Sequence, residues 1–249
     1  MSDKFVQYWE AAVPWAFKGE EMPYEKRRAL RYKLQDYMQE EMRFDSFTGK
    51  RLLEIGSGSG IDSAEFARNG ADVVSLDFTE NGVNGTKRLF KEAELQPNVV
   101  RASARQLPFK DSAFDAVYSF GVLHHIPDVD PIIADIARIV KRDGEVTLML
   151  YNKDSLLYAY SILFAHKGEG LTEDQLISRY SERILGCPYT RVYTKDEAIA
   201  LLAPFFEQTD ASVRYNVIDL PDQRKFKLDI PDKYGLGWHV IVKARRRRR

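Results

Sequence analysis

Three glycines and one acid are the residues whose types and spacing could do chemistry. Gly56, Gly58 and Gly60 follow the apolar run 51–55, and Asp77 closes the next apolar run, 72–77. Glycines allow a turn to adopt positive φ and allow a ligand to approach the backbone closely. A carboxylate about twenty residues further on can accept both hydroxyls of a ribose. The pattern predicts a turn that binds a nucleoside.

The glycine spacing departs from two common nucleotide-binding turns. The dinucleotide fingerprint requires a glycine three positions after its second one, and that position is Ile61. A phosphate loop is also excluded, because no Lys-Ser or Lys-Thr pair follows the glycines. The acid at Asp77 does not by itself separate NAD from other nucleosides.

The elements that must position these residues alternate between strand and helix. Short apolar runs predict strands at 51–55, 72–77, 98–103, 114–120 and 145–151, as expected for parallel strands covered on both faces. Between them, a helix is expected to end at Gly70. Another is expected over 131–144, with one apolar face made of Ile132, Ile133, Ile136, Ile139 and Val140. This rhythm predicts an α/β fold with a doubly wound parallel sheet, whose ligands bind beyond the carboxyl ends of the strands.

The rest of the chain divides around a core at 46–151. Residues 1–45 are predicted to be a helical lid, whose apolar stripe is formed by Leu30, Leu34, Tyr37, Met38 and Met42. Residues 152–204 are predicted to be a helical cap rich in tyrosine. Residues 205–244 are expected to close the sheet with two strands paired as an antiparallel edge hairpin, and 245–249 form a basic tail.

Four stretches of the sequence carry a resemblance to a known family. They are "LLEIGSGSG", "VVSLDFTENGV", "ARQLPFKDSAFDAVYSFGVLHHIPD" and "IARIVKRDGEVTLMLYNK", in this order. Together they resemble the class I S-adenosylmethionine-dependent methyltransferases, in the small-molecule branch that includes the ubiquinone and menaquinone biosynthesis methyltransferases. The resemblance covers about residues 50–152. It implies a Rossmann-like, seven-stranded, mostly parallel sheet and S-adenosyl-L-methionine as the cofactor.

The resemblance also implies roles for single residues of the cofactor site. The methionine part of the cofactor would be surrounded by Glu54, Gly56, Gly58 and Gly60. Asp77 would hold the ribose and Phe78 would lie against adenine. Ser103 and Ala104 stand where the family often has an acid that meets the adenine amino group, so a hydroxyl or backbone group would serve here. Phe120 and Gly121 would border the sulfonium.

The acceptor side is expected just beyond the fourth and fifth strands. Methyl transfer from a sulfonium is an in-line displacement, so the protein mainly aligns the reactants and excludes water. His124 is the candidate base, since a histidine with a pKa of ~6.5 takes a proton at neutral pH. We expect His125 to turn toward the helix that Pro127 begins, while Tyr151 and Asn152 orient the acceptor. In the alternative, both histidines only pack the loop.

Aromatic residues near the chain start suggest that part of the lid moves. Residues 1–25 and 152–204 are predicted to form a mobile cover over the acceptor site, because displacement chemistry needs water excluded. The aromatic side chains concerned are Tyr8, Trp9, Trp15 and Phe17. In the alternative, these side chains only pack on the outer helices.

The charge composition limits the classes of partner that the protein is expected to bind. Lys plus Arg and Asp plus Glu are 37 each, and without the arginines at 245–249 the positive total falls to 32. Such a body matches nucleic acid poorly, so a small-molecule acceptor is expected rather than a nucleic acid. The arginine run is either a tail for an anionic partner or a frayed end.

A single cysteine, Cys187, excludes an internal disulfide and a thiolate metal site, and no metal is expected. No run approaches the ~20 apolar residues of a membrane span, and the charged first residues are unlike a signal peptide. A cytoplasmic enzyme is therefore expected, with its oligomeric state open. The alternatives are a nucleic-acid or protein methyltransferase and a non-catalytic cofactor-binding protein.

Overall fold

The computed structural model of the chain describes residues 3–16, 22–182, 184–219 and 225–247. By its contacts the chain divides into two compact units. One comprises Met1–Ser119, Pro131–Val146 and Arg245–Arg249; the other comprises Phe120–Asp130 and Thr147–Ala244. Each unit is described by itself.

Among the described residues, the main sheet has seven strands in the order β3-β2-β1-β4-β5-β9-β6, mostly parallel with one antiparallel strand. The predicted fold class is therefore confirmed. Its strands are β1 (Arg51–Ile55), β2 (Asp72–Asp77), β3 (Val99–Arg101), β4 (Phe114–Phe120), β5 (Val140–Tyr151), β6 (Phe206–Arg214) and β9 (His239–Arg246). The last two are neighbours in this order, and β6 is the edge strand.

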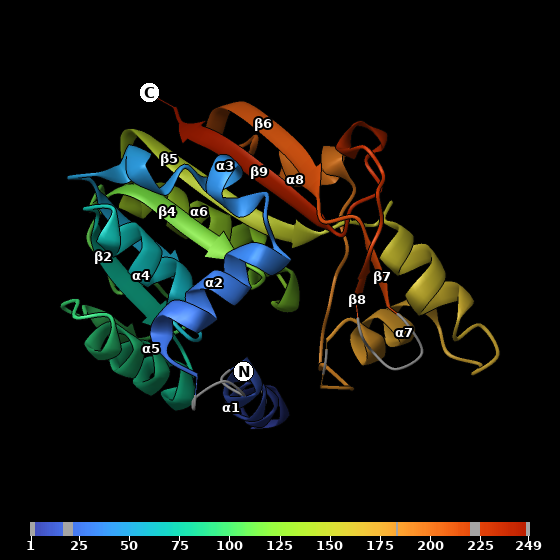
Figure 1. The fold of residues 1–249 in the computed structure, drawn as a ribbon. Coiled ribbons are helices and arrows are strands. Elements are labelled where there is room, and N and C mark those ends of the chain that lie inside the picture. The colour runs from blue at the N-terminus through green and yellow to red at the C-terminus, as the bar shows by residue number, and fades with distance from the viewer. Residues whose placement is uncertain (1–2, 17–21, 183, 220–224, 248–249) are drawn as a thin grey trace. The chain divides into compact units, whose positions relative to one another are not determined.

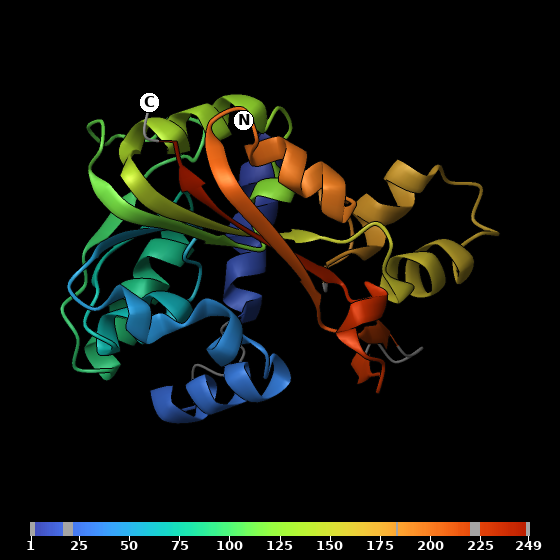
Figure 2. The same cartoon turned by 90° about the horizontal axis from the view of Figure 1, so that it is seen from above.

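The first unit places β1 between β2 and β4, all parallel. Leu53 lies opposite Val74 on one side and Val117 on the other. The parallel register brings the carboxyl ends of the three strands to one edge. The helices that pack around them are α4 (Ile61–Arg68), α5 (Glu80–Glu92) and α6 (Asp130–Ile139), with α4 and α6 on opposite faces of the sheet (Figures 1 and 2). Layers on both faces explain why most side chains of these strands are buried and apolar.

The N-terminal segment is helical, as predicted, and consists of α1 (Asp3–Ala16), α2 (Tyr24–Leu34), α3 (Met38–Met42) and the 3₁₀ turn η1 (Phe44–Phe47). The predicted apolar stripe is interrupted, however, because the chain turns between α2 and α3. Met38 and Met42 are buried, whereas Leu30 and Leu34 are 44% and 50% exposed. Phe17 lies outside the described residues, and so does the side chain of Trp15.

The predicted helix over 131–144 ends early, at Ile139, and β5 begins at Val140. The five residues of its apolar face are nevertheless all buried. Gly144 lies inside the strand rather than at a helix end. A Cβ at this position would come within 2.9 Å of the Asp115 carbonyl oxygen and 2.6 Å of Val140 Cγ1, so the glycine permits a close approach of two chain segments.

The second unit carries the cap segment and the closing strands. Its helical elements are the short η2 (Leu123–His125), the π-helix η3 (Leu157–Phe164), α7 (Glu173–Tyr180), α8 (Lys195–Leu202) and η4 (Asp232–Tyr234). Capping boxes at Thr172/Gln175 and Thr194/Glu197 begin α7 and α8. A separate antiparallel pair, β7 (Val217–Asp219) and β8 (Lys225–Lys227), lies in the sequence between β6 and β9.

Candidate functional site

The glycine turn after β1 is closed by the backbone. The N–H groups of Gly56 and Ser57 both donate to the Leu76 carbonyl, at 2.7 and 3.1 Å, and that of Gly60 donates to the Ser57 carbonyl at 2.7 Å. Gly60 begins α4 with φ +78°, and a Cβ here would lie 2.8 Å from Thr86 Cγ2. Both the backbone conformation and the space at this position therefore require glycine.

Asp77 is the acid that the turn faces. Its Oδ2 accepts the Gly58 N–H at 2.8 Å, and its Oδ1 accepts the Thr79 N–H at 2.9 Å and the Thr79 hydroxyl at 2.7 Å. Burial raises the pKa of Asp77, and the hydrogen bonds from Thr79 and Gly58 oppose that rise. A carboxylate offers about four lone-pair positions, so this acid is fixed in direction and can still accept a ligand hydroxyl.

Glu54 provides a second buried carboxylate near the turn. It accepts a hydrogen bond from the Ser63 hydroxyl. Burial raises the pKa of Glu54 well above its usual value, and the neighbouring charge of Asp62 raises it further. Asp62 itself is paired with Arg31 at 2.7 Å. A cation placed beside Glu54 would oppose this rise, so the site suits the ammonium group of an amino acid.

Gly58 shows that space is available at the turn. It has φ +51°, and a Cβ built on it meets no atom within 4 Å. Because its N–H already holds Asp77, a ligand could pass over its backbone and reach the carboxylate. The turn, Glu54 and Asp77 therefore fit a molecule with an amino-acid part and a ribose, as S-adenosylmethionine has.

The predicted adenine residues lie beside Asp77. Phe78 follows it directly and packs against Phe5 of α1, with ring centroids 5.9 Å apart. The Ala102 N–H donates to the Asp77 carbonyl at 3.0 Å, so the next residues, Ser103 and Ala104, begin at the same end of β2. The Ser103 hydroxyl accepts the Arg105 N–H at 3.2 Å.

Phe120 and Gly121 belong to the second unit. The rings of Phe120 and His239 pack nearly perpendicular to each other, with centroids 5.5 Å apart. Gly121 has φ +75°, and its Cβ would lie 3.4 Å from Met149 Cε. Their predicted place beside the sulfonium stays a prediction.

His124 is fully buried in the second unit. Its ring packs on Tyr151 at 3.9 Å between centroids. Burial lowers the pKa of His124 well below its usual value, and the neighbouring His125 and His239 lower it further. Burial therefore favours the neutral imidazole form of His124.

His125 does not turn toward the expected helix, and Pro127 does not begin one, because α6 begins at Asp130. The His125 ring instead meets the segment after α7. Its Nδ1 lies 3.2 Å from Thr190 Oγ1 and 3.5 Å from Cys187 Sγ, and its Nε2 lies 3.3 Å from Glu182. Burial alone would lower the pKa of His125, but the contacts with Cys187 and Glu182 raise it to about 10.

Tyr151 is the last residue of β5 and Asn152 follows it, and their side chains make different contacts. The Tyr151 hydroxyl donates to Glu182 at 2.5 Å, and its ring stacks on Trp238 at 4.2 Å. The Asn152 amide donates to the carbonyls of Gly235 and Gly237, at 2.9 and 2.7 Å. Its own oxygen accepts the backbone N–H of Asp154. Asn152 therefore tethers a loop, and Tyr151 is the better candidate for acceptor contact.

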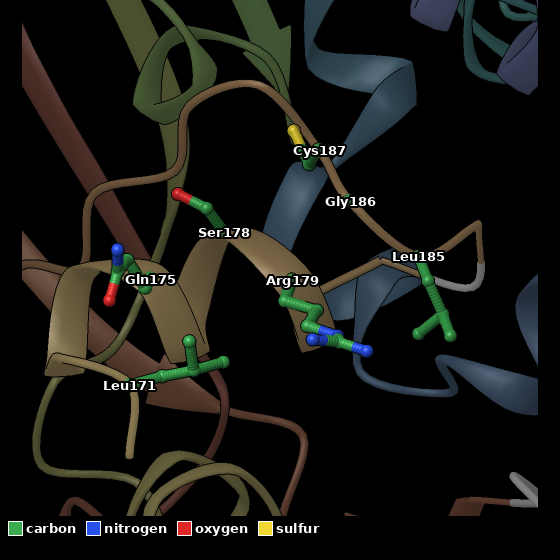
Figure 3. Close-up of a pocket in the computed structure, with 7 residues that line it drawn as sticks. All are labelled: Leu171, Gln175, Ser178, Arg179, Leu185, Gly186 and Cys187. Carbon is green, nitrogen blue, oxygen red and sulfur yellow. The ribbon is translucent and has the colours of Figure 1, made fainter. Parts of the chain in front are cut away.

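A pocket of about 470 Å³ also lies in the second unit, along α7 (Figure 3). Its lining consists of Leu171, Gln175, Ser178, Arg179, Leu185, Gly186 and Cys187. The Cys187 sulfur points away from the other labelled side chains (Figure 3), toward its contact with His125.

Sequence reasoning missed several residues that position the candidate site. Thr79 carries the signal of a helix N-cap, since a threonine here precedes α5 and accepts the Gly82 N–H. Gly82 lies in the first turn of the same helix. A Cβ at this position would lie 2.5 Å from Asp77 Cγ, so there is no room for a side chain. No local sequence pattern points to Glu182 or Trp238. Both are far from Tyr151 in the sequence and contact it only in the folded chain.

Comparison with known proteins assigns the core. A family model described as "Methyltransferase domain" matches residues 53–148, which hold the glycine turn and Asp77. Residues 53–148 form a methyltransferase domain. The predicted family and enzyme class are thereby confirmed for this domain, and so is S-adenosylmethionine as its cofactor.

Two curated relatives resemble this methyltransferase domain. Demethylmenaquinone methyltransferase of Thermobifida fusca is 35% identical over 106 residues, which are 42% of this chain and 44% of the relative. Ubiquinone biosynthesis O-methyltransferase of Dechloromonas aromatica is 31% identical over 121 residues, 48% of this chain and 52% of the relative. The matches span about half the length of these relatives.

Solved structures share the fold over more of the chain. A SAM-dependent methyltransferase from Thermotoga maritima covers 92% of this chain and 96% of its own, with a TM-score of 0.60 at 16% identity. One from Methanosarcina mazei covers 80% and 92%, with a TM-score of 0.59 at 19% identity. At such identities the likeness shows the fold alone.

Proposed function

We propose that the whole protein transfers a methyl group from S-adenosylmethionine to a small-molecule acceptor of the quinone-ring type. The part of the proposal that concerns the cofactor rests on one observation. The Asp77 carboxylate, at the end of β2, is held in one direction by hydrogen bonds from Gly58 and Thr79. The acceptor half is supported by the relatives, whose names refer to demethylmenaquinone and to ubiquinone biosynthesis.

In this proposal the first unit binds the cofactor. Glu54 takes the ammonium group of its methionine part, and Gly56, Gly58 and Gly60 give the backbone room. Asp77 accepts the ribose hydroxyls, while Phe78 and the segment Ser103–Ala104 border adenine. When bound, the cofactor supplies an activated methyl group on a sulfonium; the residues bind, orient and exclude water.

The acceptor would be aligned by residues that follow the fourth and fifth strands. Phe120 and Gly121 would border the reacting methyl group. His124, neutral because its pKa is depressed, would take the acceptor proton at a ring nitrogen. Tyr151 would orient the acceptor, and Asn152 would hold the loop at Gly235–Gly237 in place.

The proposal also concerns the lid and cap segments, the partners and the location of the protein. Residues of the lid and cap, 1–25 and 152–204, would cover the acceptor, and no nucleic acid would be involved. Among the described residues, no helix has the length and apolar character needed to cross a membrane. The cytoplasmic location and the segment boundaries stay predictions.

The experiment is methyl transfer from isotope-labelled S-adenosylmethionine to a mixed metabolite extract, followed by mass spectrometry. The expected result is a labelled aromatic ring compound, absent when the protein carries Asp77→Ala. Label on nucleic acid or protein, or on no product at all, would contradict the proposal.

A further inference from the structure

Two buried carboxyl groups lie on either side of the glycine turn in the sequence, and they have different partners. Glu54 belongs to β1 and Asp62 to the first turn of α4. These residues are 4% and 6% exposed. A carboxyl group removed from water stays ionised only where charge or hydrogen bonds compensate it, and otherwise it keeps its proton. The partners of each group therefore indicate its protonation state.

Asp62 is paired with a cation. Arg31 of α2 donates from Nε and Nη2 to the two Asp62 oxygens, at 3.1 and 2.7 Å. The hydroxyls of Tyr118 and Tyr32 donate to the same carboxylate, at 3.0 and 3.2 Å. A bidentate guanidinium pair supported by two hydroxyls holds a negative charge at this position.

Glu54 has a neutral partner instead. Within the part of the chain that the structure describes, its side chain accepts a hydrogen bond from the Ser63 hydroxyl. That hydroxyl also lies 2.7 Å from the Ser75 hydroxyl. A hydroxyl compensates a buried negative charge less than a guanidinium does. The geometry therefore favours the carboxylic-acid form of Glu54 when no ligand is bound.

The groups that face Glu54 from three neighbouring elements support this form on balance. Burial raises the pKa of Glu54 most, and the negative charge of Asp62 on α4 raises it further, as does that of Asp77 on β2. The Ser63 hydrogen bond and the positive charge of Arg31 on α2 lower this pKa without reversing the shift. A cation that bound beside Glu54 would oppose the rise and favour the carboxylate.

We propose that Glu54 holds a proton in the cofactor-free protein and releases it when the ammonium group of the cofactor's methionine part binds. Asp62 is the positioning residue of this coupling, since its charge, fixed by Arg31, opposes a second negative charge nearby. The O–H bond of Glu54 breaks, the proton passes to the buffer, and the carboxylate keeps the electron pair. The inference rests on the proposed function and adds the proton balance of its cofactor site.

The direction of the pH effect follows from this exchange. Where free Glu54 is protonated, the cofactor must displace a proton, so its affinity rises by up to about tenfold per pH unit. The rise ends once Glu54 is already ionised in the free protein. Between about pH 6 and 7 an α-amino group, with a pKa of about 7.7–8.0, remains largely protonated. A ligand without this group should displace no proton from Glu54.

The test is calorimetric titration of the full chain in phosphate and in imidazole buffer at about pH 6.5, since the two buffers differ in ionisation enthalpy. The difference in binding enthalpy between the buffers gives the number of protons released. S-adenosylhomocysteine should release about one proton. 5′-Methylthioadenosine, which has the same nucleoside and sulfur but no amino-acid part, should release none. Because both ligands carry the ribose, this comparison separates Glu54 from Asp77, whose pKa is also raised.

Three variants test the residues themselves. Glu54→Gln keeps the shape of the protonated acid, so it should fold and bind S-adenosylhomocysteine without proton release. Asp62→Asn should reduce the release, because Glu54 would be more ionised before binding. The control is Glu65→Gln on the same helix, whose carboxylate pairs with Arg28 of α2 at 2.6 Å. This variant should keep the wild-type number of protons.

Two results with the wild type alone would overturn the inference, whether or not the variants fold. One is binding of S-adenosylhomocysteine with no proton released, and the other is equal release with both ligands. Full release in Glu54→Gln would also contradict it, and full release in Asp62→Asn would contradict the role of Asp62. Failure of the wild type to bind S-adenosylhomocysteine would instead refute the proposed function, so the two failures are distinguishable.

Discussion

Gly58 and Asp77 are joined by a hydrogen bond of 2.8 Å, from the backbone N–H of the glycine turn to the carboxylate that ends β2. The two loops that follow β1 and β2 are thereby fixed to each other before a ligand arrives. Two donors from Thr79 complete the arrangement. Because this hydrogen-bond acceptor is already ordered, little conformational entropy is lost when a ribose binds.

Asp77→Ala should weaken binding of S-adenosylhomocysteine by about 1–3 kcal/mol, because ribose hydroxyls would lose a buried acceptor. Calorimetric titration measures the change. The control is Asp72→Ala at the exposed, opposite end of the same strand, where the side chain pairs only loosely with Arg51 at 3.7 Å. Equal losses in the two variants would contradict the assigned role.

Gly82→Ala tests the packing behind that carboxylate. The added Cβ would lie 2.5 Å from Asp77 Cγ and 2.6 Å from Thr79 Oγ1, so the acid must shift. Affinity for S-adenosylhomocysteine should fall by about tenfold or more while the chain stays folded. Gly168→Ala is the control, since its Cβ meets nothing within 4 Å. Unchanged affinity of the Gly82 variant would show that Asp77 tolerates displacement.

The helix α1 should act as a latch over the cofactor. Glu10 accepts the backbone N–H groups of Glu80 and Asn81, at 2.7 and 3.1 Å, in the first turn of α5. Phe5 of the same helix packs on Phe78. Glu10→Ala should therefore speed dissociation of S-adenosylhomocysteine, whereas Gln7→Ala, on the same helix, should not.

Hydrogen exchange provides a second measurement of that latch. Amides of α1 and of the first turn of α5 should exchange more slowly when S-adenosylhomocysteine is bound. Equal protection with and without the ligand would show that α1 is a fixed part of the fold rather than a cover.

His124→Ala should lower kcat/KM by about 10²–10⁴-fold if His124 removes the acceptor proton, with cofactor affinity unchanged. Because burial lowers the pKa of His124, wild-type activity should persist well below pH 6.5. The measurement is the pH profile of both proteins. Turnover near the wild-type rate in the variant would leave alignment alone as the mechanism.

The pair His125–Glu182 should make stability depend on pH. His125 has a folded pKa of about 10 against 6.5 in the unfolded chain, so its contribution is complete below 6.5 and is lost as pH rises toward 10. Urea unfolding at several pH values should show this loss, and His125→Gln should remove it. The exposed His166–Glu169 pair gives the control variant, His166→Gln, which should keep the wild-type slope.

Local patterns predicted the cofactor core well. The strands β1, β2 and β4 begin and end where the apolar runs do, since strands buried on both faces leave a clear signal. The early end of α6 was missed: Val140 is apolar and buried in either conformation, and sheet pairing decides between them. The spacing of Leu30 and Leu34 likewise suits one helix that continues to Met38. In the structure α2 ends at Leu34 and a separate helix, α3, begins at Met38.

The acceptor side was less predictable because it is assembled from distant segments. The histidine pair was singled out from the sequence, yet the direction of His125 is set by Glu182 and Thr190, about sixty residues away. Asn152 was given a ligand role from its place at the end of β5. Its amide is instead used by backbone carbonyls near Gly235, a contact that no local pattern contains.

The central claim is that the glycine turn and Asp77 bind S-adenosylmethionine, and titration calorimetry tests it most directly. The full chain is titrated with S-adenosylhomocysteine and, separately, with NADH. We predict saturable binding of S-adenosylhomocysteine at one site, weakened in Asp77→Ala, and no binding of NADH. Binding of NADH without S-adenosylhomocysteine would contradict the account.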